Sequence, residues 1–182
     1  MKKVDLSKFD NKWYDSGSKF KRILWYLLNR YFLKTYMPYP SRIKVYILKI
    51  FGAKIGKNIV IKPNVNIKYP WFLEVGDNVW IGEGVWIDNL APVKIGSNVC
   101  ISQGAYLLTG NHNYKKESFD LIVKGIEIED GVWIGAKSVV CPGVKLKSHS
   151  ILTVGSVLTN DTEEFTIYRG NPAIPVRKRV ID

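Results

Sequence analysis

The chain has 182 residues, which is enough for one sizeable hydrophobic core with a small appended element. Its net charge is +11, but it carries no nucleic-acid recognition motif and no basic surface interleaved with stacking aromatics, so we expect no nucleic-acid partner. Two cysteines are too few for a disulfide framework. No apolar stretch is long enough to span a bilayer and no signal peptide is recognisable, so we expect a cytoplasmic protein.

The basic charge is concentrated at one end of the chain. Residues 1–54 contain 13 lysines and arginines against 3 aspartates and glutamates, whereas residues 55–182 contain 14 against 13. The excess of positive charge therefore belongs to an N-terminal segment and not to the whole molecule.

Apolar residues at helical spacing mark this N-terminal segment. They recur at intervals of three and four, which is the pattern of one face of an α-helix. The members of this face are Phe20, Ile23, Leu24, Leu27, Leu28, Tyr31 and Phe32. Ser18 is the expected N-cap, and Pro38 and Pro40 end the helix. A second helix is expected to begin near Ser41 and to stop at Gly52.

We expect residues 1–54 to form a basic helical cap over the open end of the domain that follows. Its apolar face should turn inward and its lysines toward water, because an uncovered end would leave strand edges and aliphatic side chains bare. A basic amphipathic hairpin is also typical of segments that lie on an anionic membrane surface. Peripheral contact with the inner face of a membrane is therefore an additional expectation for this segment.

From Ile55 onward, aliphatic residues recur every six positions. Typical units are IGKNIV, VGDNVW and IGEGVW. All fifteen first positions are aliphatic: Ile55, Ile61, Ile67, Val75, Ile81, Ile87, Ile95, Ile101, Leu107, Ile128, Ile134, Val140, Leu146, Leu152 and Leu158. The second position is often glycine, and the fifth is mostly small or β-branched.

This period predicts a parallel β-helix. A strand of six residues that turns a corner puts its first and fifth side chains on one face, and three such strands close a triangular coil. Stacked coils bury a continuous column of Ile, Val and Leu. An ordinary antiparallel β protein predicts period-two alternation instead, which fits much less well. The sequence therefore predicts an all-β fold of about five coils.

The repeat resembles the hexapeptide-repeat acyltransferases over residues 55–177. The similarity is greatest to the colanic-acid-type and capsule-polysaccharide O-acetyltransferases, in "VGDNVWIGEGVWIDNLAPVKIGSNVCISQGAYLLTGNHNY" and "YRGNPAIPVRKR". The resemblance implies a left-handed β-helix, acetyl-CoA as cosubstrate, and a homotrimer with active sites between neighbouring prisms. We assign residues 55–162 to the acyltransferase domain and residues 163–182 to a C-terminal tail.

The interruptions of the repeat fall at one place in each coil. After the third strand of the first three coils, the next first position lies 8, 8 and 21 residues away. Stacking should place the inserted residues 69–73, 88–92 and 109–127 along one edge of the prism. Because functional residues are often mounted on loops of a rigid scaffold, we expect one wall of a cleft there, with 109–127 as a protruding loop.

His112 lies at the base of that loop and is the candidate general base. Imidazole titrates near neutral pH, and a sugar hydroxyl is a poor nucleophile until a base takes its proton. The resemblance assigns this role to the histidine of the loop. Relatives commonly have aspartate where this chain has Asn113, so the group that orients the ring is left open between Asp88, Glu117, Asp120 and a backbone carbonyl. Asp88 and Asn113 are also expected to contact the acceptor.

The resemblance also assigns coenzyme contacts. Ala136 follows the motif WIG, and only its backbone N–H could stabilise an oxyanion, because it has no side-chain hydroxyl. The other matching positions are Val154, Thr159, Asn160 and Arg177. We expect no metal site, because the chain has only His112 and His149 as histidines. His149 occupies an ordinary corner of the repeat, where we expect it to be exposed.

Four aromatic residues occupy sixth positions and should point outward: Trp80, Trp86, Tyr106 and Trp133. Twenty residues separate Trp86 from Tyr106, so these two rings should stack. Exposed aromatics in a row need a cover. We expect that cover to be a neighbouring subunit of the homotrimer and not a bound sugar.

The predicted function is transfer of an acetyl group from acetyl-CoA to a sugar hydroxyl in surface polysaccharide biosynthesis, with a sugar or glycan as acceptor. One alternative is N-acetylation of an amino-sugar nucleotide on the same fold. Another is a non-catalytic β-helix that serves as a binding scaffold. The sequence does not identify the acceptor, because a fold is compatible with several activities.

Overall fold

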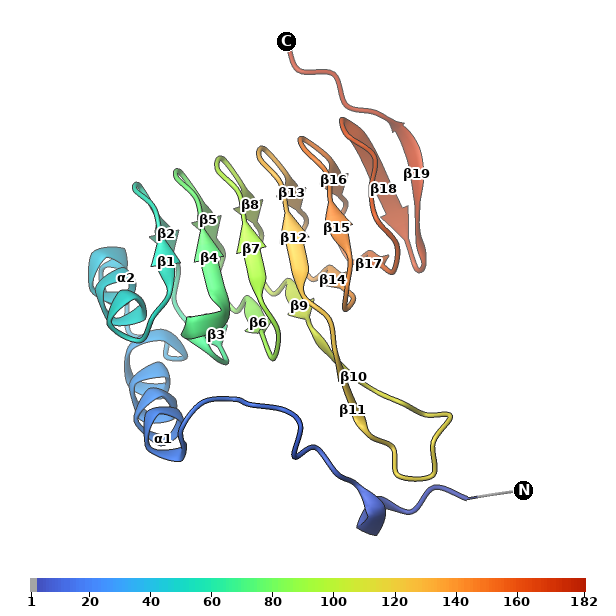
Figure 1. Ribbon diagram of the computed structural model, residues 1–182. Helices are drawn as coiled ribbons and strands as arrows, with labels where there is room; N and C mark the ends of the chain where they lie inside the picture. Colours follow the sequence, from blue (N-terminus) through green and yellow to red (C-terminus); the bar gives the residue numbers. More distant parts are fainter. Residues whose placement is uncertain (1–2) are drawn as a thin grey trace.

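The structure is a computed structural model that describes residues 3–182. The chain winds as a left-handed parallel β-helix whose short strands stack into three sheets (Figure 1). The first sheet contains β1 (Lys54–Ile55), β4 (Leu73–Val75), β7 (Val93–Ile95), β12 (Ile126–Ile128) and β15 (Lys145–Leu146). The third sheet contains β3 (Asn66–Ile67), β6 (Trp86–Asp88), β9 (Tyr106–Leu108), β14 (Val139–Val140) and β17 (Val157–Leu158).

The second sheet is longer because it continues past the last complete coil. It contains β2 (Val60–Ile61), β5 (Trp80–Ile81), β8 (Cys100–Ile101), β13 (Trp133–Ile134), β16 (Ile151–Leu152), β18 (Thr166–Gly170) and β19 (Ala173–Lys178). Five coils are complete, and β18 begins a sixth by pairing in parallel with β16. The segment expected as a C-terminal tail thus contains two strands, and the antiparallel β18–β19 pair covers the end of the prism.

The core is the predicted column of aliphatic side chains. All fifteen first positions of the repeat are buried, with Ile55 the most exposed of them at 8%. Asparagines at successive corners, Asn58, Asn78 and Asn98, adopt left-handed φ angles of 56° to 58°, a conformation that asparagine tolerates better than most residues. The period of six is therefore confirmed as the period of burial.

Two helices cover the N-terminal end of the prism (Figure 1). Helix α1 (Lys19–Leu28) continues into the π-helical turn η2 (Asn29–Leu33), and α2 (Ser41–Ile50) follows. The predicted N-cap is confirmed, since the Ser18 hydroxyl oxygen accepts a hydrogen bond from the Lys21 N–H at 3.3 Å. Within residues 3–182, no helix is both long and apolar enough to cross a bilayer.

The face of α1 that packs on the prism differs from the one predicted. The expected inward face is mostly exposed, with Phe20 at 78% and Leu27 at 47%. Trp25 is buried instead, and its indole N–H donates to the Ile67 carbonyl oxygen at 2.9 Å. The ammonium of buried Lys44 donates to the carbonyl oxygens of Ile61 and Lys62 in the same way. The open coil presents backbone acceptors, so the helices turn side chains that can donate hydrogen bonds toward it.

Candidate active site

The inserted residues 69–73, 88–92 and 109–127 form one ridge, and they all connect the third sheet to the first. Asn89 links the first two insertions, because its side chain accepts from the Tyr69 N–H at 3.0 Å and donates to the Tyr69 carbonyl oxygen at 2.6 Å. Thr109 links the second to the third by donating from Oγ1 to the Asp88 carbonyl oxygen at 2.8 Å. The insertions therefore share one edge, as the spacing of the repeat predicts. The first contains the short helix η3 (Pro70–Phe72).

The third insertion projects from the prism as a hairpin of β10 (Gly110–His112) and β11 (Leu121–Val123) (Figure 1). His112 ends β10 and is half-buried. Its ring stacks on Phe119 with 4.5 Å between centroids and an interplanar angle of 7°, and the Phe9 ring lies 5.9 Å away. Two aromatic neighbours thus restrict the orientation of the imidazole.

A backbone carbonyl fixes the tautomer of His112. Its Nδ1 lies 2.9 Å from the Phe119 carbonyl oxygen. Because a carbonyl oxygen can only accept, Nδ1 must carry the proton. A neutral ring then keeps Nε2 as a free acceptor, which is the state a general base requires.

The carboxylates considered as orienting groups are engaged elsewhere. Asp88 pairs with Lys68 at 3.0 Å, Glu117 with Lys8 at 2.6 Å, and Asp120 with Lys116 at 3.1 Å. The Asn113 amide oxygen accepts from a backbone N–H within its own turn. Of the orienting groups that the sequence left open, the one that contacts the His112 ring in the structure is a backbone carbonyl.

The N-terminal segment, residues 3–17, completes the opposite wall of the site, and sequence analysis missed this. Its short helix η1 (Leu6–Lys8) lies near the hairpin, and the Asp5 N–H donates to the Glu117 carbonyl oxygen at 2.9 Å. The Tyr14 hydroxyl donates to the Leu90 carbonyl oxygen at 2.7 Å, and burial raises the pKa of Tyr14 above its usual range. The aromatics Phe9, Trp13 and Tyr14, close together in a segment rich in charged residues, were the available signal.

A cleft of about 540 Å³ lies between this segment and the ridge. His112, Tyr14, Lys68, Tyr69 and Leu90 are among the residues that line it. The cleft thus combines an imidazole whose Nε2 is free to accept a proton with hydroxyl groups and a cation. That set of groups suits proton abstraction from a polar substrate.

The chain is similar to known acetyltransferases in sequence and in fold. A family model described as the hexapeptide repeat of succinyl-transferase matches residues 73–109 and 125–160. The chain is 34% identical over 177 residues, 97% of either chain, to WcaF of Escherichia coli K12, whose name assigns it to colanic acid biosynthesis as an acetyltransferase. It is 28% identical over 135 residues, 72% of this chain and 66% of the other, to galactoside O-acetyltransferase of the same organism.

The chain belongs to the hexapeptide-repeat acetyltransferases. Solved structures of this family share the fold. The hexapeptide-repeat acetyltransferase VCA0836 of Vibrio cholerae, complexed with acetyl coenzyme A, superposes with a TM-score of 0.80 at 23% identity, over 92% of this chain and 93% of that one. A galactoside acetyltransferase in complex with coenzyme A gives 0.76 at 22% identity, over 90% and 84%.

The positions expected to contact the coenzyme lie at three places, which are two edges of the prism and the terminal strand β19. Ala136 and Val154 occupy successive coils at the edge between the second and third sheets, where the Gly155 N–H donates to the Ala136 carbonyl oxygen at 2.9 Å. Thr159 and Asn160 follow β17 and are exposed on the ridge edge. Arg177 is exposed on β19. A single chain therefore brings Ala136 and Val154 together but separates them from His112.

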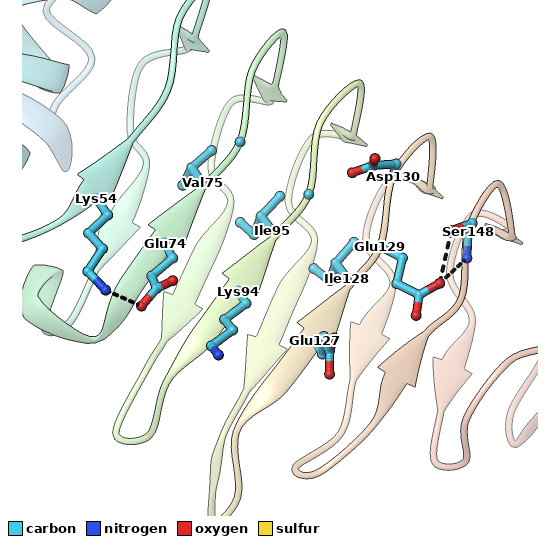
Figure 2. Close-up of a pocket in the computed structure, with 12 residues that line it drawn as sticks. Lys54, Glu74, Val75, Lys94, Ile95, Glu127, Ile128, Glu129, Asp130 and Ser148 are labelled. Atoms are coloured by element: carbon cyan, nitrogen blue, oxygen red, sulfur yellow. Dashed lines mark hydrogen bonds and ion pairs between the residues drawn. The ribbon is translucent and has the colours of Figure 1, made fainter.

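The hollow on the outer face of the first sheet is a different kind of surface (Figure 2). It has a volume of about 510 Å³, and its floor is a ladder of alternating charge across paired strands. Within the hollow the ladder runs Lys54, Glu74, Lys94 and Glu127, and the strand pairing continues it to Lys145 beyond the hollow. Cross-strand pairs of opposite charge neutralise one another, and none of the residues that line this hollow is a histidine or a cysteine.

The aromatic residues at the sixth positions point outward as predicted, whereas His149 is not exposed as predicted. Trp86 and Tyr106 stack with 4.8 Å between centroids, and Trp80 and Trp133 are 62% and 46% exposed. His149 is half-buried and not exposed, because its ring stacks on Phe165 at 4.6 Å. Among residues 3–182, no three His, Cys, Asp or Glu side chains gather as metal ligands.

Proposed function

We propose that the protein is an acetyl-CoA-dependent O-acetyltransferase, that His112 is its general base, and that its acceptor is a sugar of a surface polysaccharide or its precursor. One observation carries the proposal: the Phe119 carbonyl holds His112 Nδ1–H at 2.9 Å and leaves Nε2 free in a substrate-sized cleft. The names of WcaF and of galactoside O-acetyltransferase support the choice of reaction and acceptor.

The proposed reaction is a direct transfer. His112 Nε2 takes the proton of an acceptor hydroxyl as its oxygen attacks the thioester carbonyl carbon. The oxyanion that forms accepts a hydrogen bond from the Ala136 N–H, which has no partner among residues 3–182. The carbon–sulfur bond then breaks, and the imidazolium returns the proton to the departing thiolate. An acetyl ester and the free thiol of coenzyme A result.

A homotrimer would complete the site. His112 lies on the ridge, whereas Ala136 and Val154 lie on another edge of the same prism. Packing the ridge of one chain against that other edge of a neighbour would bring base and coenzyme contacts together, and cyclic symmetry repeats this contact three times. The exposed Trp80 and Trp133 would be covered in such an assembly.

The exposed face of α1 supports contact with an anionic membrane surface. Its apolar side chains are Phe20, Ile23, Leu24 and Leu27, and Tyr31 of η2 continues the stripe; these residues are between 39% and 78% exposed. No acidic residue occurs between Asp15 and Glu74, so the surrounding charge is basic. A solvent-facing apolar stripe flanked by lysine and arginine is the pattern of helices that lie in the interface of a bilayer.

The decisive experiment measures acetyl-CoA turnover of wild type, His112→Ala and His112→Gln. Acceptors with a free hydroxyl and with a free amine are compared, and the acetylated product is identified by mass spectrometry. We expect both variants to lose about 10²-fold to 10⁴-fold in kcat while their sedimentation is unchanged. Unchanged turnover in both variants would remove His112 as the base, and exclusive acetylation of amines would replace O-acetyl by N-acetyl transfer.

A further inference from the structure

A second cavity opens where α1 and η2 meet the prism. It has a volume of about 360 Å³ and lies between these helical turns and strands β3 and β6. We call it the basic pocket and define it by four cations and an aromatic wall: Arg22, Arg30, Lys34, Lys68 and Trp86. None of the residues that line it carries a carboxylate.

Most of this positive charge is not neutralised by the protein. Lys68 pairs with Asp88 at 3.0 Å. In the part of the chain that the structure describes, Arg22, Arg30 and Lys34 form no ion pair. Three cations around one concave surface repel one another, so the pocket has a favourable site for an anion.

Two buried polar atoms in the wall also lack partners. Asn29 is 7% exposed, and its amide nitrogen donates to Asn66 Oδ1 at 2.7 Å, while its own Oδ1 has no hydrogen bond. The Nε of Arg22 is buried and equally without a partner. Such groups are uncommon in folded proteins and mark places where a bound molecule can complete the hydrogen bonds. A free acceptor and a free donor together suit a ligand with both hydroxyl and phosphate groups.

Trp86 gives the pocket an apolar wall. One side of its ring stacks on Tyr106, and the Lys34 ammonium lies 5.7 Å from the ring centroid. The indole remains 41% exposed. An exposed aromatic face beside cations can hold the apolar face of a sugar ring while the cations hold its charged substituent.

The basic pocket is continuous with the His112 cleft. Arg22, Lys68 and Tyr69 line both cavities. One ligand can therefore lie with a hydroxyl at His112 and a charged group among the arginines.

We infer that the basic pocket binds the phosphate or diphosphate group of a phosphorylated sugar, which is the acceptor of the reaction proposed above. The two N–H groups of an arginine guanidinium can bind two oxygens of one phosphate. Three unpaired cations also suit a phosphate or diphosphate, which carries more than one negative charge, better than a carboxylate, which carries one. The inference rests on the proposed function only in identifying the bound sugar as the acceptor. Binding of the phosphate group can be measured without turnover.

The test compares wild type with Arg30→Gln/Lys34→Gln by titration calorimetry, with inorganic pyrophosphate as the first probe. Lys57→Gln/Lys62→Gln is the control, because it removes the same charge from exposed lysines of the first coil. We expect pyrophosphate to bind wild type and the control alike and to bind the pocket variant at least about tenfold more weakly. Equal binding to all three proteins, or none, would overturn the inference.

Further titrations identify the carrier of the phosphate. The titrations compare three ligands, which are glucose 1-phosphate, a nucleoside diphosphate sugar and a short-chain prenyl diphosphate sugar. The ligand that binds most tightly identifies the source of the phosphate group, provided that its binding also weakens in the pocket variant. For an accepted substrate, we expect the pocket variant to raise the acceptor KM and to leave kcat and the acetyl-CoA KM unchanged. A rise in the acetyl-CoA KM alone would instead make the pocket part of the coenzyme site and overturn the inference.

Discussion

The β-helix and the N-terminal segment are stabilised in different ways. In the β-helix, side chains are buried against side chains, and every first position of the repeat is in the core. In the segment before Lys54, Leu33 and Leu48 are also buried, but further contacts join side-chain donors to the backbone of the first coil, as with Trp25 to the Ile67 carbonyl oxygen. Apolar pattern alone therefore determines burial along the prism, whereas at its end the hydrogen-bonding needs of the exposed backbone also decide which helix residues are buried.

The comparison predicts a large loss of stability for one apolar side chain and almost none for another. Ile101 is 1% exposed in the column, whereas Leu27 is 47% exposed on α1. We expect Ile101→Ala to lower the free energy of unfolding by about 2–5 kcal/mol, because it leaves a cavity. Leu27→Ala should change it by less than about 0.5 kcal/mol. Urea unfolding of both variants measures the difference, and equal losses would mean that α1 buries its apolar face.

The exposed apolar residues of α1 should strengthen binding to membranes even though they contribute little to the free energy of unfolding. We expect Phe20→Ser/Leu27→Ser to weaken binding to phosphatidylglycerol vesicles about tenfold or more, because each side chain contributes more than about 1 kcal/mol when buried in lipid. Ile174→Ser/Val180→Ser is the control, since these apolar residues are also exposed, at 60% and 83%, but lie at the other end of the prism. Co-sedimentation with vesicles gives the ratio, and equal binding of both double variants would exclude a specific membrane face.

The smallest expected effect concerns the charged face in Figure 2. Lys145 and Ser148 hold the Glu129 carboxylate and lower its pKa to about 2. Because the folded pKa lies below the usual 4.5, the stabilisation is complete above that pH and is lost as pH falls toward 2. Wild type should exceed Glu129→Gln in unfolding free energy by about 1 kcal/mol near pH 7, since the pair is partly exposed to solvent. A difference that did not shrink on acidification would contradict this assignment.

Much of the site could be predicted because the repeat is regular. Counting in sixes placed the three insertions on one edge and His112 on that edge. The partner of His112 could not be found in this way. It is a carbonyl oxygen presented by Phe119, whose φ of 52° is unusual for an aromatic residue, and no pattern of side chains encodes it. The contribution of residues 3–17 was missed for a related reason, since single hydrogen bonds such as Tyr14 to Leu90 leave no periodicity.

The central claim is that the ridge of one chain supplies the base to coenzyme contacts on another, and complementation between inactive variants tests it most directly. His112→Ala removes the base, and Val154→Trp fills the coenzyme edge at a residue that is 69% exposed, so the core is unaffected. The two variants are unfolded together, refolded at equal amounts and assayed with acetyl-CoA. Random trimers should recover about one quarter of wild-type activity, because one in four contacts between neighbouring chains then pairs an intact His112 with an intact Val154. Mixtures no more active than the separate variants would contradict a site shared between chains.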